Sequence, residues 1–258
     1  MPDSYFQFRV THQGFATRLF LNDILIDSDP DGVFKKRNLL CNQFVTDGVN
    51  RVRMEISIPN PPDLPKEMKL TIALYQLTDQ QISSNQLPEP LLQLEFPGKT
   101  SPSFPASLEG EVAIASGLGR WEWEDSDTIE SIEKEDVAAI STLLKKLHIA
   151  LSDKNLPAIQ SLMELKTREM ALAYHIPLAT RVSDQEEFFK GIFNDTQFTM
   201  NPLSLDQLQI DPMAGNRFFV LERKDGKGLL ESAELTEGYS FSLPVSVSRI
   251  NGIWTIVR

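Results

Sequence analysis

The first half of the chain alternates apolar and polar residues, which is the pattern of β-strands with one buried face. In residues 51–58, RVRMEISI, every second residue is apolar. The segments MKLTIALYQL, LLQLEF and EVAIA are further strand candidates, and ATRLFLNDILI breaks at Asn22-Asp23, which predicts a hairpin. Proline-rich connections separate these segments. The pattern therefore predicts an all-β sandwich over residues 1–118.

The period changes to that of helices after residue 131. One apolar row recurs at helical spacing: Val137, Ile140, Leu144, Leu147 and Leu151. A second helix is expected with Pro157 in its first turn, where a missing N–H costs nothing, and with its end before Pro177. A third short helix is expected to begin at Ser183, because Ser183 and Glu186 fit a capping box.

Strand patterns return after residue 194. They are LDQLQI, RFFVLE, GLLESAEL, SFSLPVSVS and IWTIV, with turn dipeptides at Asp225-Gly226 and Asn251-Gly252. Three helices followed by an antiparallel sheet predict an α+β domain over residues 135–258.

Composition narrows the class of protein. The 258 residues carry a net charge of −11 and one cysteine, Cys41. An acidic chain repels phosphate backbones, so nucleic acid is not expected as a partner. We also expect no membrane association, because no apolar run is long enough to span a bilayer, and the N-terminus does not resemble a signal peptide. These features favour the cytoplasm.

The charge is concentrated between Glu122 and Asp136, where eight acidic residues and one lysine give a net charge of −7. We expect residues 119–134 to form a solvated acidic linker. The alternative is a docking surface for a basic protein, for which the candidates are Glu122, Glu124, Asp125 and Asp127.

Two segments of the second half, LLKKLHIALSDKNLPAIQSLM and SVSRINGIWTIVR, resemble the NTF2-like (cystatin-like α+β) superfamily. The resemblance rests on the D-x-x-A/L break between two helices and on Gly-x-Trp in the last strand, here Gly252 to Trp254. It implies three helices packed on a curved antiparallel sheet, with a conical pocket between the sheet and a long helix. It also implies a homodimer through that sheet, since many members only bind or dimerise, while some are enzymes.

The first half resembles carbohydrate-binding-type β-sandwiches. The segments LFLND and FVTDGVNRVRMEIS carry this resemblance. The alternative is any other Ig-like or jelly-roll sandwich.

The segment LIDSDPDGVFKKRN contains the opening half of a calcium-binding loop, D-x-D-x-D-G, with Asp27, Asp29 and Asp31 as weak candidate ligands. Position 12 of the loop is Asn38 rather than a bidentate acid, and basic residues precede it. We therefore expect an acidic turn, no metal site and no cofactor.

Catalytic motifs are absent from the sequence: there is no G-x-S-x-G, H-E-x-x-H or C-x-x-C. Cys41 is expected to be a buried apolar residue. If the second domain has a pocket, the candidate lining residues are Tyr174, His175, Asp211 and Trp254, with Asp211 and His175 as an acid–base pair.

We therefore expect a non-catalytic interaction protein, of the adaptor or immunity type, that recognises a basic partner. The alternative is a small-molecule-binding protein or an enzyme that uses the pocket of the NTF2-like domain.

Overall fold

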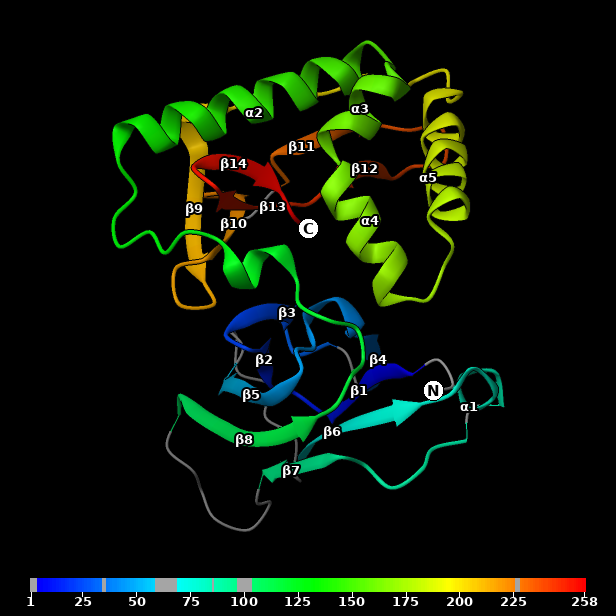
Figure 1. Ribbon diagram of the computed structural model, residues 1–258, viewed down its shortest axis with the longest axis vertical. Coiled ribbons are helices and arrows are strands. Elements are labelled where there is room, and N and C mark those ends of the chain that lie inside the picture. Colours follow the sequence, from blue (N-terminus) through cyan, green and yellow to red (C-terminus); the bar gives the residue numbers. More distant parts are fainter. Residues whose placement is uncertain (1–3, 34–35, 59–68, 85, 97–103, 226–227) are drawn as a thin grey trace. The chain divides into compact units, whose positions relative to one another are not determined.

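The computed structural model describes residues 4–33, 36–58, 69–84, 86–96, 104–225 and 228–258. These residues form five α-helices and four antiparallel sheets, so the expected mixture of helices and antiparallel strands is confirmed. The chain divides into two compact units, Met1–Arg120 and Trp121–Arg258, which we call unit 1 and unit 2 (Figure 1).

The described part of unit 1 has eight strands in two four-stranded antiparallel sheets, with strand orders β4-β1-β6-β7 and β3-β2-β5-β8. The strands are β1 Tyr5–His12, β2 Ala16–Leu21, β3 Ile24–Asp29, β4 Lys36–Leu40, β5 Gly48–Ser57, β6 Leu70–Leu77, β7 Leu92–Phe96 and β8 Ala106–Ile114. A short helix, α1 (Asp79–Ser84), follows β6, and a 3-10 turn spans Asn42–Phe44. The sequence pattern did not predict β1 or β4.

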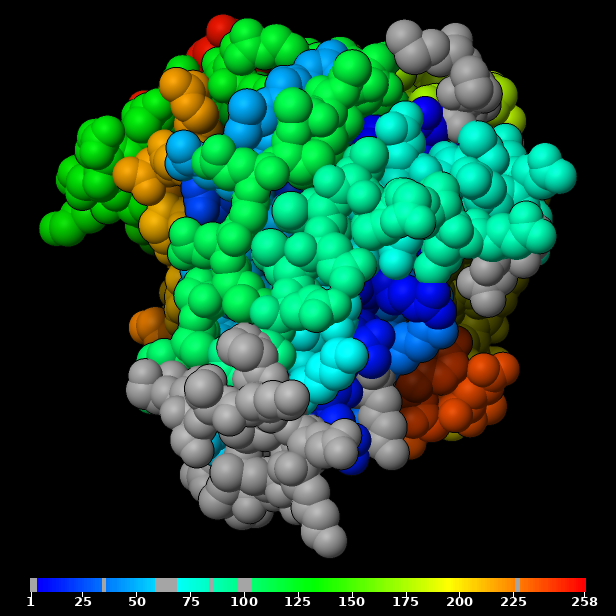
Figure 2. All heavy atoms as spheres, turned by 90° about the horizontal axis from the view of Figure 1, so that it is seen from below, coloured from blue at the N-terminus to red at the C-terminus, as the bar shows by residue number. Residues whose placement is uncertain are grey.

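Apolar and polar residues alternate along the strands of unit 1, so one face of each sheet is buried in the core of this unit. In β5, the apolar side chains Val52, Met54 and Ile56 are buried while their neighbours are exposed or half-buried. Residues 79–84, 86–96 and 106–114 form much of the surface seen in Figure 2. Gly110 of β8 lies against β7 of the other sheet, because a Cβ at this position would lie 3.0 Å from Leu94 Cδ2. The two sheets therefore approach each other closely at this edge.

The hairpin predicted at Asn22-Asp23 is confirmed. Both residues have positive φ, 53° and 60°, and Leu21 pairs with Ile24 across the turn. Asparagine and aspartate tolerate this conformation because their short polar side chains bond locally. The dipeptide therefore fixes which residues of β2 and β3 face each other.

Unit 2 begins with a 3-10 helix, Glu122–Asp125, and continues with four α-helices in the described residues, where the sequence predicted three. They are α2 Lys134–Ser152, α3 Leu156–Leu162, α4 Glu164–Ala173 and α5 Leu178–Phe193. The expected second helix is divided at Met163, which ends α3 and precedes α4. Pro157 lies in the first turn of α3, as predicted.

The helix start predicted at Ser183 is wrong. Helix α5 begins at Leu178, with Pro177 as its N-cap, and Ser183 lies inside it. A proline has the φ of a helix start but lacks the N–H that a continuing helix needs, so one proline both follows α4 and opens α5. The S-x-x-E spacing of Ser183 and Glu186 occurs within one continuous helix.

The main sheet of unit 2 has the strand order β14-β13-β10-β9, and a two-stranded sheet joins β11 and β12. A 3-10 turn, Leu205–Gln207, precedes the first strand. The strands are β9 Leu208–Met213, β10 Phe218–Arg223, β11 Leu230–Glu234, β12 Ser240–Leu243, β13 Val245–Ile250 and β14 Ile253–Ile256. The hairpin predicted at Asn251-Gly252 is confirmed, with φ values of 50° and 78°. The expected turn at Asp225-Gly226 lies partly outside the described residues.

Helix α2 runs across the main sheet, and α3 to α5 lie at one end of it (Figure 1). Ile140, Leu144 and Leu147 of α2 share one core with buried residues of the sheet. The rings of Phe219 and Trp254 meet edge to face at 5.2 Å within this core. Side chains therefore fill the centre of the space between the long helix and the sheet, where the resemblance implied a conical pocket. A hollow of about 450 Å³ remains beside it, lined by residues of α2 and by Gly252, Ile253 and Trp254.

The acidic segment, described by sequence as a solvated linker, is part of unit 2 in the structure. Trp121, Trp123, Ser126 and Ile129 are all at least 95% buried. The ring of Trp123 packs edge to face on Phe218 of β10, with the centroids 6.0 Å apart. Apolar residues interleaved with the acids therefore hold this segment against the sheet. No helix in the described residues is long and apolar enough to cross a membrane.

Candidate functional site

A cavity of about 310 Å³ lies between α4 and α5, which we call the α4–α5 cavity. Its lining comprises Met163, Lys166, Thr167, Met170, Arg181, Asp184, Gln185, Phe188, Phe189 and Leu243. On each helix the lining residues recur every three or four positions, so they share one face. Two facing helices therefore line a space that combines sulfur, aromatic rings and charged groups, and that is open to solvent at Asp184 and Phe188.

Lys166 is the most unusual group in the α4–α5 cavity. Desolvation, together with the positive charges of Arg258 and Arg181, lowers its pKa to about 8. Its Nζ donates to the carbonyl oxygen of Pro244 at 3.4 Å, a long contact. No ion pair among the described residues includes Lys166, and the lining has two cations, Lys166 and Arg181, but one carboxylate, Asp184.

A second hollow of about 350 Å³ adjoins the α4–α5 cavity, because Thr167 and Gln185 line both. The hydroxyl of Thr167 donates to Gln185 Oε1 at 3.2 Å. The rest of this hollow includes the polar side chains of Gln160, Ser161 and Arg168. One hydrogen-bonded pair therefore contributes to the lining of both hollows.

A buried ion pair lies behind the cavity. Arg258 Nη1 contacts Glu169 Oε2, and the two side chains are only 6% and 5% exposed. Glu169 Oε1 also accepts a hydrogen bond from the backbone N–H of Glu122 at 2.7 Å, and the guanidinium of Arg258 lies 5.2 Å from the ring centre of Trp121. We call these four residues the Glu169 clasp. It joins the start of unit 2, α4 and Arg258, and it fixes the positive charge that acts on Lys166.

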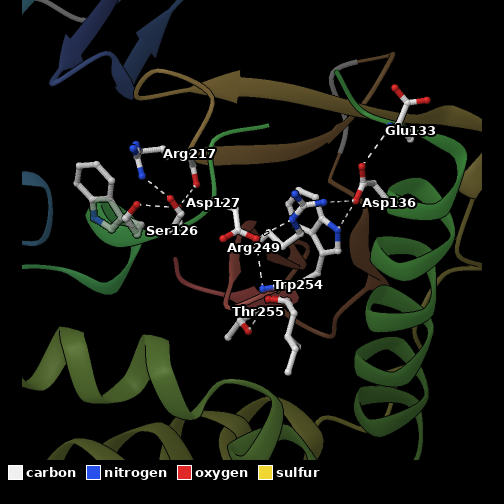
Figure 3. A network of polar contacts seen from close by, with 11 residues as sticks. Ser126, Asp127, Glu133, Asp136, Arg217, Arg249, Trp254 and Thr255 are labelled. Carbon is white, nitrogen blue, oxygen red and sulfur yellow. Dashed lines mark hydrogen bonds and ion pairs between the residues drawn. The ribbon is translucent and has the colours of Figure 1, made fainter. Parts of the chain in front are cut away.

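The network in Figure 3 explains the role of Trp254, which sequence analysis placed in a pocket. Its indole N–H donates to Asp136 Oδ1 at 3.0 Å, and Arg249 Nη1 lies 3.2 Å from the same oxygen (Figure 3). Arg249 Nε also pairs with Asp127 at 2.9 Å. Burial raises the pKa of Asp136, but the hydrogen bonds from Trp254 and Glu133 and the charge of Arg249 outweigh it, so the pKa lies below its usual range. These contacts give Trp254 and two acids of the acidic segment a structural role.

The four candidates for docking a basic partner have different surroundings. Glu122 pairs with Arg168 at 3.1 Å on the surface, and Glu124 accepts from the backbone N–H of Trp121 at 2.7 Å. Asp127 pairs with Arg249, and Asp125 is exposed. Glu122 and Asp127 therefore form ion pairs within unit 2, which reduces the negative charge that they offer a partner.

The other pocket candidates do not come together. Tyr174 ends α4, and His175 follows it with a φ of 55°. Asp211 lies in the edge strand β9 and accepts from Gln209 at 2.8 Å. Figure 1 places β9 and the end of α4 at different sides of unit 2. The structure therefore gives no basis for an acid–base pair of Asp211 and His175.

The candidate calcium ligands lie around an arginine. Asp27 pairs with Arg37, and Asp29 lies 3.4 Å from His12 Nε2 and 3.7 Å from Arg37 Nη2. Asp31 is exposed in the turn after β3. The guanidinium thus supplies the positive charge that offsets Asp27 and Asp29. In the described part of the chain, no group of three or more His, Cys, Asp or Glu side chains is placed to hold a metal ion.

Cys41 is buried in unit 1, with 1% of its surface exposed, and burial raises the pKa of its thiol strongly. A thiol that stays protonated is a poor nucleophile. This placement agrees with the interpretation of Cys41 as a small apolar residue.

Sequence analysis missed Lys166, Arg181 and Asp184. The spacing of Met163, Lys166 and Met170 on one helix, and of Arg181, Asp184 and Phe188 on the next, was present in the chain. It indicates that each set shares a helix face, but not that the two faces meet around a cavity.

The chain matches no family model, no curated protein and no solved structure.

Proposed function

We propose that the protein is a non-catalytic binding protein, and that unit 2 holds a small organic anion with an apolar tail in the α4–α5 cavity. The observation that carries the proposal is Lys166, a partly buried cation that forms no ion pair among the described residues. It lies in a cavity whose lining also includes methionine and phenylalanine side chains and has two cations, Lys166 and Arg181, against one carboxylate, Asp184. The volume of about 310 Å³ suits a small ligand.

The energetics favour an anion in this position. Burying an ammonium without a counter-ion is costly, and the depressed pKa of Lys166 expresses that cost. A bound carboxylate would supply a negative charge opposite the ammonium of Lys166 and accept a charge-assisted hydrogen bond from it. Such a bond contributes about 1.5–3 kcal/mol. The side chains of Met163, Met170 and Phe189 would cover the apolar tail.

Two methionines in the lining allow a direct test with 4-phenylbutyrate as the probe. In protein labelled with ¹³C at the methionine methyl groups, the probe should shift the signals of Met163 and Met170. The signals of Met54 in unit 1 and Met213 in β9 should not move, because neither residue lines the cavity. Shifts that spare Met163 and Met170 would contradict the proposal.

A charge-removing variant tests the role of Lys166. Lys166→Met should weaken 4-phenylbutyrate binding by about tenfold or more, the size expected for one charge-assisted hydrogen bond. Lys145→Met is the matched control, because Lys145 is an exposed lysine of α2 outside the cavity. Equal affinities in the two variants would exclude Lys166 as the anchor.

The affinity should also depend on pH. Lys166 is mostly protonated below its pKa of about 8, so binding should be constant near pH 6–7. Above about pH 8 the free protein loses the positive charge, and the affinity for the carboxylate should fall. A flat profile between pH 6 and pH 9.5 would show that the ammonium does not hold the ligand.

Recognition of a basic protein is the second candidate function. Glu130, Glu133 and Glu135 are exposed near the start of α2 and carry negative charge within six residues of the chain. Such a group would steer a basic partner, with an association rate that falls as salt rises. Replacing all three with glutamine should slow the association with a captured partner. An unchanged association rate would contradict this second function.

The fold assignments are also proposals. We propose that unit 1 is a β-sandwich, supported by its two four-stranded sheets and by the close approach at Gly110. We propose that unit 2 is a variant of the NTF2-like fold, supported by a long helix across an antiparallel sheet and by the hairpin that ends in Trp254. A homodimer through this sheet would have to accommodate Trp123 on Phe218; light scattering would measure the oligomeric state.

A further inference from the structure

Lys166 is an amine as well as a cation. It lies on α4 one turn from Met163 and from Met170, and Asp184 and Phe188 of α5 line the same cavity. Its contact with the carbonyl of Pro244, at 3.4 Å, is too long to hold the amine firmly. The cavity wall therefore presents a nitrogen nucleophile to whatever occupies the space between the helices.

We propose that Lys166 forms a reversible imine with a small organic acid that carries an aldehyde or ketone group, such as a 2-oxo acid. This inference rests on the proposed function, because the same cavity must first admit the ligand. Arg181 lines the cavity beside Lys166 and supplies a second cation for the carboxylate of such a ligand.

The reaction balances without an oxidant or a reductant. The neutral amine of Lys166 attacks the carbonyl carbon, a C–N bond forms, and the carbonyl oxygen takes up a proton to give a carbinolamine. Loss of that hydroxyl group as water then gives the imine, and hydrolysis reverses both steps. Asp184 supplies the carboxylate of the cavity lining and is the candidate for carrying protons between nitrogen and oxygen.

The surroundings favour this chemistry at Lys166 over other lysines. With a pKa of about 8, roughly a tenth of the amine is neutral at pH 7, whereas an ordinary lysine is neutral in less than roughly one molecule in a thousand. A desolvated lysine in an apolar site is an activated nucleophile.

Glyoxylate, which is both an aldehyde and a carboxylate, is a suitable probe for the full chain. In the presence of cyanoborohydride, which reduces an imine to a stable secondary amine, each reacting lysine becomes N-carboxymethyl-lysine. Peptide mass spectrometry should find Lys166 modified about tenfold faster than Lys145 at pH 7. Equal rates at Lys166 and Lys145, or no modification of Lys166, would overturn the inference.

The variant Lys166→Arg separates the imine from anion binding, because it keeps the positive charge but removes the reactive amine. It should still bind 4-phenylbutyrate, with shifts at Met163 and Met170, while the fast modification by glyoxylate disappears. Lys145→Arg should leave the fast modification unchanged. If the wild type binds 4-phenylbutyrate but Lys166 does not react, only the imine fails. If the wild type shows no methionine shifts, the proposed function itself fails.

Discussion

Replacing Glu169 with alanine is expected to destabilise unit 2 by about 3–5 kcal/mol. The side chains of Glu169 and Arg258 are 5% and 6% exposed, so the variant would leave a buried guanidinium without its counter-ion. It would also remove the acceptor of the Glu122 backbone N–H, which lies 2.7 Å from Glu169 Oε1. An unsatisfied buried donor alone costs about 1–3 kcal/mol, so the two losses together place the effect in the upper half of the range.

A second ion pair of α4 provides the control. Arg168 and Glu122 lie 3.1 Å apart, but their side chains are 53% and 47% exposed. Exposed pairs contribute about 0–1 kcal/mol, so Arg168→Ala should have a small effect. Since both changes fall on neighbouring positions of one helix, the difference between them isolates burial as the cause.

Urea unfolding followed by tryptophan fluorescence is the appropriate assay. The three tryptophans, Trp121, Trp123 and Trp254, all lie in unit 2, so the signal reports this unit and not unit 1. The double variant Glu169→Leu/Arg258→Met should regain much of the stability, because it removes both charges. A loss of under about 1 kcal/mol for Glu169→Ala would show that Arg258 reaches water when unpaired, and the reasoning from burial would be wrong.

Three further results are expected. The indole of Trp254 donates to Asp136, whose pKa is low, so unit 2 should lose stability as pH falls below about 4. Asp136→Asn should reduce this loss of stability at low pH, measured by a fluorescence-monitored titration. Gly32→Ala should lower the unfolding free energy of unit 1 by about 1–3 kcal/mol, measured by unfolding followed with circular dichroism. The φ of Gly32 is +65°, and the new Cβ would lie 2.9 Å from the backbone oxygen of Phe15. Gly117→Ala, at a similar φ but with open space around it, should cost less. Cys41 should react with a thiol reagent only after unfolding; rapid reaction of the native protein would contradict its burial.

Local sequence patterns predicted elements well where one dipeptide or one row of residues decides the structure. Asn22-Asp23 and Asn251-Gly252 adopt positive φ, so each fixes a hairpin with little help from the rest of the chain. The row from Ile140 to Leu151 similarly specifies α2. These signals are strong because the conformational preference of the residues and the burial of their apolar side chains favour the same structure.

Prediction failed where local preference competes with its context. The spacing of Ser183 and Glu186 imitates a helix start, but Pro177 opens the helix earlier. Eight acids around Trp121 and Trp123 suggested a solvated segment, because charge counts ignore which apolar residues lie between the acids. Lys166 gave no signal at all, since its low pKa depends first on burial between two helices and then on the charge of Arg258, which is distant in the sequence.

The packing of Trp123 on Phe218 has a practical consequence for dividing the chain. A fragment that starts at residue 135, the boundary expected from sequence, would lack Trp121 and Trp123 and would leave Phe218, now 1% exposed, uncovered on the sheet. Such a fragment should aggregate, since an uncovered aromatic surface on a β-sheet invites self-association. A fragment that starts at residue 119 keeps that covering and the Glu169 clasp, and it is the shortest reasonable choice for producing unit 2 by itself.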